Sequence, residues 1–236
     1  MVKKVAINMK KARGFTLLEM SMVLVVIAVI LGMVSLGKDL NRNAEYTKIY
    51  ANFIQQWALV YDSYLSRTGV VPGDNQAAPT LQVNANQTLL CQPAAVGAPV
   101  ASLFTVMAAA GVRLPNGRAA GFENHYAYLD SNGNPQDIAV CFQNMAWLEP
   151  NGLGGFVNRN RNVMVLTGLT PDLARSLDSI IDGQADARFG LFRQNPPLTA
   201  VTSQPWTANN TQALVGGNAF DEGQVIVTSA VYRMPR

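Results

Sequence analysis

The feature that most constrains this chain is one long apolar segment near its N-terminus. Residues 15–36 comprise 22 residues with a single charged side chain, Glu19. A helix rises about 1.5 Å per residue, so this segment is long enough to cross a bilayer core of about 30 Å. It is too long for the apolar core of an ordinary cleaved signal, and no small-residue cleavage site follows it. We therefore predict a membrane-anchoring helix.

Beyond the apolar segment, the predicted helix continues and becomes amphipathic. Large apolar side chains recur mostly three and four residues apart, charged residues lie mostly between them, and no proline interrupts the pattern. Gly69 is expected to cap the helix, with Pro72 as a stop shortly after it. One helix is therefore predicted over residues 15–68, with its membrane-spanning part at about residues 15–36.

Residues 69–236 are predicted to form one α+β globular domain. Turn-forming residues without clear periodicity dominate up to about residue 99. Helical and strand-like segments then occur in separate blocks, as is typical of α+β domains. The expected helices span residues 100–110 and 170–182, and the expected strands span residues 125–129, 138–142, 163–166 and 225–232.

The charged residues are unevenly distributed along the chain. There are 18 lysines and arginines against 15 aspartates and glutamates, and five of the basic residues precede Gly14. From Phe15 onward, 13 basic residues face 15 acidic ones. A basic stretch ahead of an apolar helix favours retention of that end in the cytoplasm. The basic residues after Phe15 are dispersed, so they form no basic face that would predict a nucleic-acid partner. Arg159 and Arg161 form the only close pair, and a solvated loop accounts for them.

The residues around position 14 form the string Lys10-Lys11-Ala12-Arg13-Gly14-Phe15-Thr16-Leu17-Leu18-Glu19. With the apolar run that follows, this string closely resembles the prepilin signature of type IV pilins and of type II secretion pseudopilins. The resemblance implies a pilin-like fold, in which a long helix packs on a small antiparallel sheet. It also implies that residues 1–14 are a leader removed by a prepilin peptidase, and that the new amine of Phe15 is then methylated.

Glu19 is the residue for which the physical argument is sharpest. A lone carboxylate in an apolar membrane helix costs on the order of 3 kcal/mol at the bilayer centre, and less near the interface, so it needs a partner. The amine of Phe15 suits this role, because residues four apart share a helix face. The resemblance implies the amine of a neighbouring subunit, so that Glu19 would guide assembly. An interfacial acid favoured only by the positive helix N-terminus is the alternative.

A second resemblance concerns residues spread along the chain. It involves Gly69-Val70-Val71-Pro72-Gly73-Asp74, Leu177-Asp178, Asp182-Gly183, Gly190 and Arg193. These residues look like those of a subgroup of pilin-like proteins, which tend to show paired acids before the glycine at position 183. Here Ile181 occupies one of those places. Helix caps and turns are the alternative explanation.

Cys91 and Cys141 lie in the part of the chain predicted to face a compartment that permits disulfides. If they pair, the loop they close spans 50 positions, and the chain-entropy model gives roughly 4 kcal/mol of stabilisation. Two buried free thiols are the alternative, because the sequence does not give the geometry that a bridge requires.

Four residues with side-chain oxygens, Asp130, Asn132, Asn134 and Asp137, alternate in a way that partly resembles a calcium loop. Some pseudopilins hold calcium in their soluble domain. However, the bidentate acid expected twelve residues after the start of such a loop is absent, and the segment is typical of a hairpin turn. Turn chemistry is the preferred explanation, and no cofactor is expected.

The sequence contains no enzymatic constellation. The single histidine, His125, lies in a strand-like run, and there is no Cys/His cluster, phosphate loop or nucleophile elbow. We therefore expect a structural subunit of a type IV pilus-like filament, of minor or specialised type, and not an enzyme.

The resemblance also implies partners and a location. The partners are the prepilin peptidase, other pilin or pseudopilin subunits and an inner-membrane assembly platform. The chain would cross the bacterial inner membrane once, with its N-terminus cytoplasmic and its domain periplasmic, before it enters an extracellular or periplasmic filament. Two alternatives stay open: a pseudopilin of a type II secretion system, and a single-pass anchor for a binding or enzymatic domain.

Overall fold

The computed structural model describes residues 14–85, 88–91, 102–197, 200–206, 214–215, 218–219 and 225–235. The side chains of residues 34–36, 38–39, 214–215 and 218–219 lie outside this description. Most of the predicted leader, residues 1–13, also lies outside it. The chain divides into two compact units, Met1–Ala44 and Glu45–Arg236.

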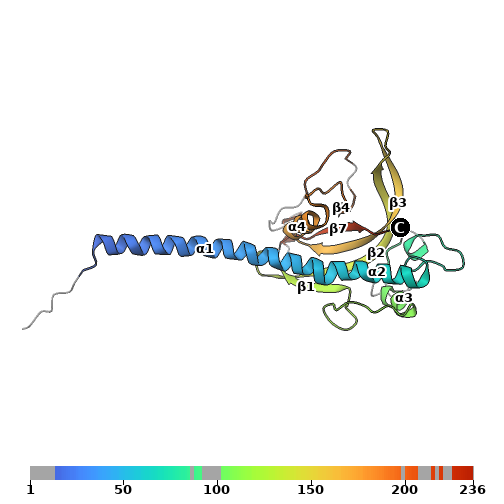
Figure 1. Ribbon diagram of the computed structural model, residues 1–236, viewed down its shortest axis with the longest axis horizontal. Coiled ribbons are helices and arrows are strands. Elements are labelled where there is room, and N and C mark those ends of the chain that lie inside the picture. The colour runs from blue at the N-terminus through green and yellow to red at the C-terminus, as the bar shows by residue number, and fades with distance from the viewer. Residues whose placement is uncertain are drawn as a thin grey trace, which may run out of the picture. The chain divides into compact units, whose positions relative to one another are not determined.

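The predicted long helix consists of three consecutive pieces, of which Figure 1 labels the first and the last, α1 and α2. They are α1 (Leu17–Ile49), the π-helical turn η1 (Tyr50–Ile54) and α2 (Gln55–Thr68). Gly69 ends the helix in the left-handed conformation, with φ 76°, and its N–H donates to the carbonyl of Leu65 at 2.9 Å. The cap at Gly69 is therefore as predicted.

The π-helical turn was not predicted. The N–H of Gln55 donates to the carbonyl of Tyr50, a bond between residues five apart where an α-helix joins residues four apart. The extra residue leaves large apolar side chains buried on both sides of the turn, Ile49 before it and Trp57 after it. The departure from α geometry is therefore compatible with one continuous buried face.

A five-stranded sheet forms the centre of the second unit (Figure 1). Its strands, in the spatial order β1-β2-β3-β7-β4, span His125–Leu129 (β1), Pro135–Pro150 (β2), Phe156–Leu169 (β3), Thr228–Arg233 (β7) and Phe192–Asn195 (β4). All four pairings are antiparallel. The short strands β5 (Leu214–Val215) and β6 (Asn218–Ala219) pair only with each other. The predicted α+β class is confirmed.

The hairpin of β2 and β3 is much longer than the predicted strands 138–142 and 163–166. Its register continues without interruption to the pair Pro150 and Phe156. Polar residues dominate the outer part of β3 and interrupt the apolar residues in the outer part of β2, so the continuous apolar runs marked only the inner part of each strand. The prediction of a solvated loop at Arg159 and Arg161 was therefore wrong. Both lie in β3, and Arg161 donates to the two carboxylate oxygens of Glu149 at 2.8 Å each.

The tip of this hairpin is exposed and held by one side chain. Asn151 accepts hydrogen bonds from the N–H groups of Leu153 and Gly155, both at 2.9 Å. The side chain of Leu153 is 92 % exposed. The tip therefore keeps its shape through a local turn and contributes nothing to the core.

The buried face of η1 and α2 packs on one face of the sheet through aromatic rings. The ring centroids of Trp57 and Tyr61 lie 6.2 and 5.3 Å from that of Phe142 in β2, and the ring of Phe53 lies 5.3 Å from that of Tyr126 in β1. This is the face that the three- and four-residue spacing predicted. The burial of these rings, at roughly 25 cal/mol per Å² of apolar area, makes a large contribution to the stability of the unit.

The opposite face of the sheet carries a smaller apolar cluster. Alternate residues of β2 point to it, because successive side chains of a strand face opposite sides. The buried members are Cys141, Trp147, Val163, Val165 and Val231.

The remaining helices lie where the sequence places them. Helix α3 spans Leu103–Ala109, and the hydroxyl of Ser102 accepts the N–H of Thr105 at its start. Helix α4 spans Pro171–Asp182, with Thr170 as its N-cap and Gly183 as a left-handed C-cap. A short 3₁₀ turn, η2, spans Val83–Ala85 in the predicted loop region.

Candidate processing and assembly site

The predicted cleavage site lies directly before α1. Gly14, Phe15 and Thr16 are not helical, and α1 begins at Leu17. Apart from its chain neighbours, no atom of the described residues lies within 4 Å of the position that a Cβ on Gly14 would take, and Phe15 is 80 % exposed. The peptide bond between Gly14 and Phe15 is therefore open to another protein.

Thr16 and Glu19 cap the start of α1 by hydrogen bonds to each other. The carboxylate of Glu19 accepts the N–H of Thr16 at 2.7 Å and its hydroxyl at 2.9 Å. In return, the N–H of Glu19 donates to the hydroxyl oxygen of Thr16 at 3.2 Å. This reciprocal arrangement is a capping box, which satisfies N–H groups that the first turn of a helix leaves free. Thr16 was not predicted as a site residue, although its Thr-x-x-Glu spacing is a known signal for such a box.

The first part of α1 presents an apolar surface that is exposed in the single chain. Every side chain from residue 15 to residue 33 is exposed, and Leu17, for example, is 92 % exposed. Continuous apolar surface of this kind marks a site of protein or membrane contact. None of the helices has a described stretch that is both long and apolar enough to cross a membrane. The last part of the predicted span, residues 34–36, lies outside the described side chains.

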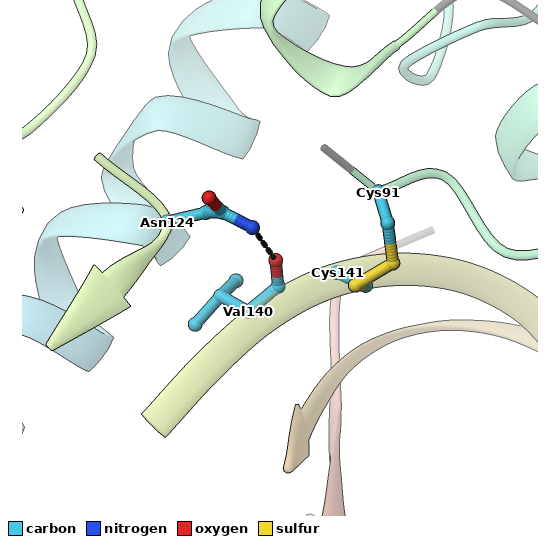
Figure 2. Close-up of a disulfide and its surroundings, with 4 residues drawn as sticks. All are labelled: Cys91, Asn124, Val140 and Cys141. Carbon is cyan, nitrogen blue, oxygen red and sulfur yellow. Dashed lines mark hydrogen bonds between the residues drawn. A yellow bond between two sulfur atoms is a disulfide. The ribbon is translucent and has the colours of Figure 1, made fainter. Parts of the chain in front are cut away.

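Cys91 and Cys141 form a disulfide, which confirms the predicted pairing (Figure 2). Their Cα atoms are 4.8 Å apart. The bridge follows directly on a backbone pairing between Leu90 and Phe142, whose N–H groups donate to each other's carbonyls at 2.7 and 3.0 Å. The disulfide therefore fastens the loop before α3 to strand β2.

Figure 2 also shows a second attachment beside the disulfide. The side chain of Asn124 donates to the carbonyl of Val140 at 3.1 Å, and the N–H of Val140 donates to the carbonyl of Asn124 at 2.9 Å. Asn124 is buried, with 1 % of its surface exposed. These bonds hold the start of β1 against β2.

Three of the four residues considered for calcium, Asp130, Asn132 and Asn134, lie in the turn between β1 and β2. The carboxylate of Asp130 accepts the N–H groups of Asn132 and Asn134, both at 2.9 Å, and the N–H of Val225 at 3.1 Å. These hydrogen bonds lower the pKa of Asp130 against the opposing effect of its burial. In the described part of the chain, no group of three or more His, Cys, Asp or Glu side chains could hold a metal ion. Asp130 therefore organises the turn and fastens it to the segment before β7.

Asp137, the fourth of these residues, is engaged elsewhere. Its carboxylate lies 2.6 Å from Nδ1 of His125 and 3.4 Å from the guanidinium of Arg118. His125 is a residue of β1, as predicted, and its register partner is Ala139. His125 is therefore a partly buried residue of the edge strand β1, and its ring pairs with the carboxylate of Asp137.

Part of the second resemblance comes together around the C-terminal half of α4: Asp178, Asp182, Gly183 and Gly190. The segment 69–74 lies elsewhere, after α2, where the carboxylate of Asp74 accepts the N–H groups of Thr80 and Leu81 at 2.9 and 2.8 Å. The carboxylate of Asp182 accepts the N–H groups of Leu191 and Phe192 at 2.9 and 2.8 Å. Gly190 has φ 94°, and a Cβ there would overlap the Asp182 carboxylate. Asp182 therefore clamps the start of β4 to α4, and only glycine fits beside it.

Asp178 lies one turn earlier on α4 and is fully buried. One carboxylate oxygen accepts the indole N–H of Trp206 at 2.8 Å and the N–H of Asp186 at 2.6 Å. Burial, with a smaller contribution from the charge of Asp182, raises the pKa of Asp178 to about 7 against the opposing effect of these two hydrogen bonds. Asp178 thus ties two loop segments to the helix from inside the domain.

Arg193, the last of this group, covers the apolar cluster on the second sheet face. Its guanidinium lies 3.9 Å from the ring centroid of Trp147 and donates to the carbonyls of Gly190 and Leu148 at 3.0 and 2.9 Å. Burial lowers the pKa of Arg193 to about 10. Every described contact of Asp178, Asp182, Gly190 and Arg193 is with another residue of the same domain. This agrees with the alternative that these residues serve as helix caps and in turns.

Comparison with known proteins agrees with the N-terminal site. Residues 9–35 match the family model of the prokaryotic N-terminal methylation motif. The chain therefore carries the prepilin signature of type IV pilins and pseudopilins, and its α+β fold is pilin-like. No curated protein and no solved structure matches the chain significantly. The motif implies a structural subunit that a prepilin peptidase processes, and that is anchored in a membrane before it assembles with other such subunits.

Proposed function

We propose that this chain is a minor or specialised subunit of a type IV pilus-like filament and is made as a precursor. The prepilin peptidase cuts between Gly14 and Phe15, and the new amine of Phe15 is methylated. The observation that carries the proposal is the methylation motif over residues 9–35. The open surroundings of Gly14 support it, because a protease must take up the backbone on both sides of the bond.

The cut changes the partners available to Glu19. In the uncut chain, the nitrogen of Phe15 is an uncharged amide, and the Glu19 carboxylate accepts hydrogen bonds from Thr16. Cleavage turns that nitrogen into a charged amine. A charged donor binds a carboxylate about twice as strongly as a neutral one. The amine of a neighbouring subunit can therefore displace the hydroxyl of Thr16, and the pair fixes the position of the incoming subunit.

The apolar start of α1 serves both stages of this process. In the precursor, the helix lies in the inner membrane over about residues 15–36, with the basic N-terminus cytoplasmic and residues 69–236 periplasmic. In the filament, helices of neighbouring subunits replace the lipid. The exposure of every side chain from residue 15 to residue 33 supports this, because the same surface suits both environments. An inner-membrane platform would drive the transfer.

The proposal is tested by expressing the full chain beside a prepilin peptidase, followed by intact mass measurement and N-terminal sequencing. The expected product lacks residues 1–14 and carries one additional methyl group on Phe15. Gly14→Val should remain uncut, because a branched side chain obstructs the backbone at the cut. Any other N-terminus in the wild-type chain would refute the proposal.

Assembly needs a separate readout. Glu19→Gln should be cut normally but should be absent from filaments sheared from the cell surface, whereas the control Glu45→Gln should be cut and incorporated. Wild-type chain in sheared filaments would favour a pilus. A secretion defect without surface filaments would indicate a type II secretion pseudopilus instead.

A further inference from the structure

A groove on the second unit lies between the long helix and the loop after α3. Its volume is about 700 Å³. One wall is formed by the end of α1, by η1 and by α2, and the other by residues 113–117, with Tyr126 of β1 beside them. Among its lining residues, Tyr126 contacts Phe53 in the core.

The groove is elongated. The side chains of its helical wall recur three or four residues apart from Lys48 to Ser63 and so follow one side of the helix. At 1.5 Å per residue, this stripe is about 22 Å long. A groove of this length fits a short stretch of a linear polymer better than a compact small molecule.

Its polar side chains are free to bind a ligand. Six of them form no hydrogen bond or ion pair with any residue that the structure describes: Lys48, Asn52, Gln56, Ser63, Arg113 and Asn116. This differs from the carboxylates around α4, each of which is engaged internally. Three of the six are amides, which offer a donor and an acceptor on the same side chain.

The charged side chains that line the groove are all basic. Lys48 and Arg113 line it, and no acidic side chain does. Both cations are exposed, and a guanidinium binds a carboxylate through two parallel hydrogen bonds. The ligand should therefore be anionic, and carboxylates are among the groups that Lys48 and Arg113 can bind.

The rest of the lining favours a sugar over a peptide. Hydroxyl groups donate and accept, as the amides do. The ring of Tyr126 is partly buried and is held by Phe53, with 5.3 Å between the ring centroids, so it offers a fixed apolar surface for the C–H face of a sugar ring. Peptides are usually recognised through strand pairing or apolar pockets. Here both long walls are helix and loop, and the amides of Asn52, Gln56 and Asn116 lie along them beside the apolar residues Leu59, Val60, Leu114 and Pro115.

The π-helical turn runs along the same groove. Asn52 belongs to η1 and lines the helical wall. Turns of this kind occur frequently at functional sites, where they place side chains that a regular helix would direct elsewhere. The π-helical turn therefore indicates that the groove is a functional site, and this indication does not depend on the charge of the groove.

We propose that this groove binds a carboxylate-bearing oligosaccharide. Lys48 and Arg113 bind its carboxylates, the amides bind its hydroxyls, and the ring of Tyr126 packs against one sugar. The proposal does not depend on filament assembly, because the groove lies within the second unit.

The test is calorimetric titration of the full chain, in a zwitterionic detergent, with three probes of equal length. These are an oligogalacturonate, a neutral malto-oligosaccharide and an oligoglutamate. We expect the oligogalacturonate to bind most tightly, with an affinity that falls as salt is added. Lys48→Gln and Arg113→Gln should each weaken its binding about tenfold, the usual effect of one lost charge-assisted hydrogen bond.

The control is Arg159→Gln, which removes an arginine that lies in β3, is not part of the groove lining and has a side chain that is 63 % exposed. It should leave the affinity unchanged. Asn116→Ala provides a second groove variant, and thermal unfolding checks that every variant folds. Equal binding of the neutral sugar, tighter binding of the oligoglutamate, or no binding of the oligogalacturonate at roughly 10 mM would each overturn the proposal.

Discussion

Asp178 shows how a single buried side chain makes the stability of this domain depend on pH. Its pKa is about 7 in the folded chain, against an ordinary value of 3.8. The folded state therefore keeps a proton that the unfolded state releases above about pH 4. The contribution of Asp178 to stability is full below that pH and is lost as the pH rises toward 7.

We expect Asp178→Asn to remove this pH dependence. Asparagine stays neutral, and its oxygen can still accept the N–H groups of Trp206 and Asp186. The variant should melt at a higher temperature than wild type at about pH 8 and at a similar temperature at about pH 4. Thermal unfolding at both pH values measures this. A variant less stable than wild type at the higher pH would contradict the assignment.

The glycines around α4 offer a matched pair of substitutions. Gly183 and Gly190 both have positive φ, 80° and 94°, but only at Gly190 would a Cβ overlap another group, the carboxylate of Asp182. Gly183→Ala should cost about 1 kcal/mol from its backbone conformation alone. Gly190→Ala should cost about 1 to 3 kcal/mol more, because Asp182 must leave its two N–H partners. Urea unfolding of the two variants tests the clamp, and equal losses would argue against it.

At the level of elements, the π-helical turn η1 gives the sharpest prediction. A turn with one residue more than an α-turn can lose a residue and close to α geometry without changing the faces on either side. Deletion of Asn52 should therefore leave Trp57 and Tyr61 on the sheet and preserve cooperative unfolding. Deletion of Leu59, within α2, should rotate the following residues by about 100° and abolish the fold. Circular dichroism melting compares the two chains, and loss of the fold in both would refute this account of the turn.

The same elements show what the sequence could and could not predict. The ends of the helices at Gly69 and Gly183 were predicted because a glycine in the left-handed conformation leaves a clear local signal. The π-helical turn was not predicted, because large apolar residues spaced three and four apart occur both in regular α-helices and around π-helical turns. The outer part of the β2–β3 hairpin was also missed, since its pairing depends on contacts such as that of Arg161 with Glu149.

The N-terminal site was predicted more completely than the domain. Gly14, Phe15 and Glu19 belong to a local string, whereas the partners of Asp178 and Asp182 come from segments 8 to 28 residues further along the chain. The capping box between Thr16 and Glu19 was within reach of sequence analysis. The groove was not, because its two walls meet only through the fold of the domain.

For the whole domain, the disulfide between Cys91 and Cys141 is the main covalent constraint, and it closes a loop of 50 residues. Reduction should lower the free energy of unfolding by about 2 to 4 kcal/mol, because the unfolded chain regains the freedom that the closed loop removes. Urea unfolding with and without dithiothreitol measures the difference. The double variant Cys91→Ala/Cys141→Ala is the control, and it should be less stable than wild type yet indifferent to the reductant. No difference between reduced and oxidised wild type would show that the bridge is not needed for stability.

The tip of the β2–β3 hairpin offers a practical handle on the molecule. The side chain of Asn151 orders the turn through its two hydrogen bonds, and the side chain of Leu153 at the end of the tip is 92 % exposed. A short epitope inserted after Leu153 would leave both sheet faces and the groove intact. Immunogold labelling of that epitope on whole cells would then reveal, under the electron microscope, where on the cell envelope the subunit resides and how densely it is spaced.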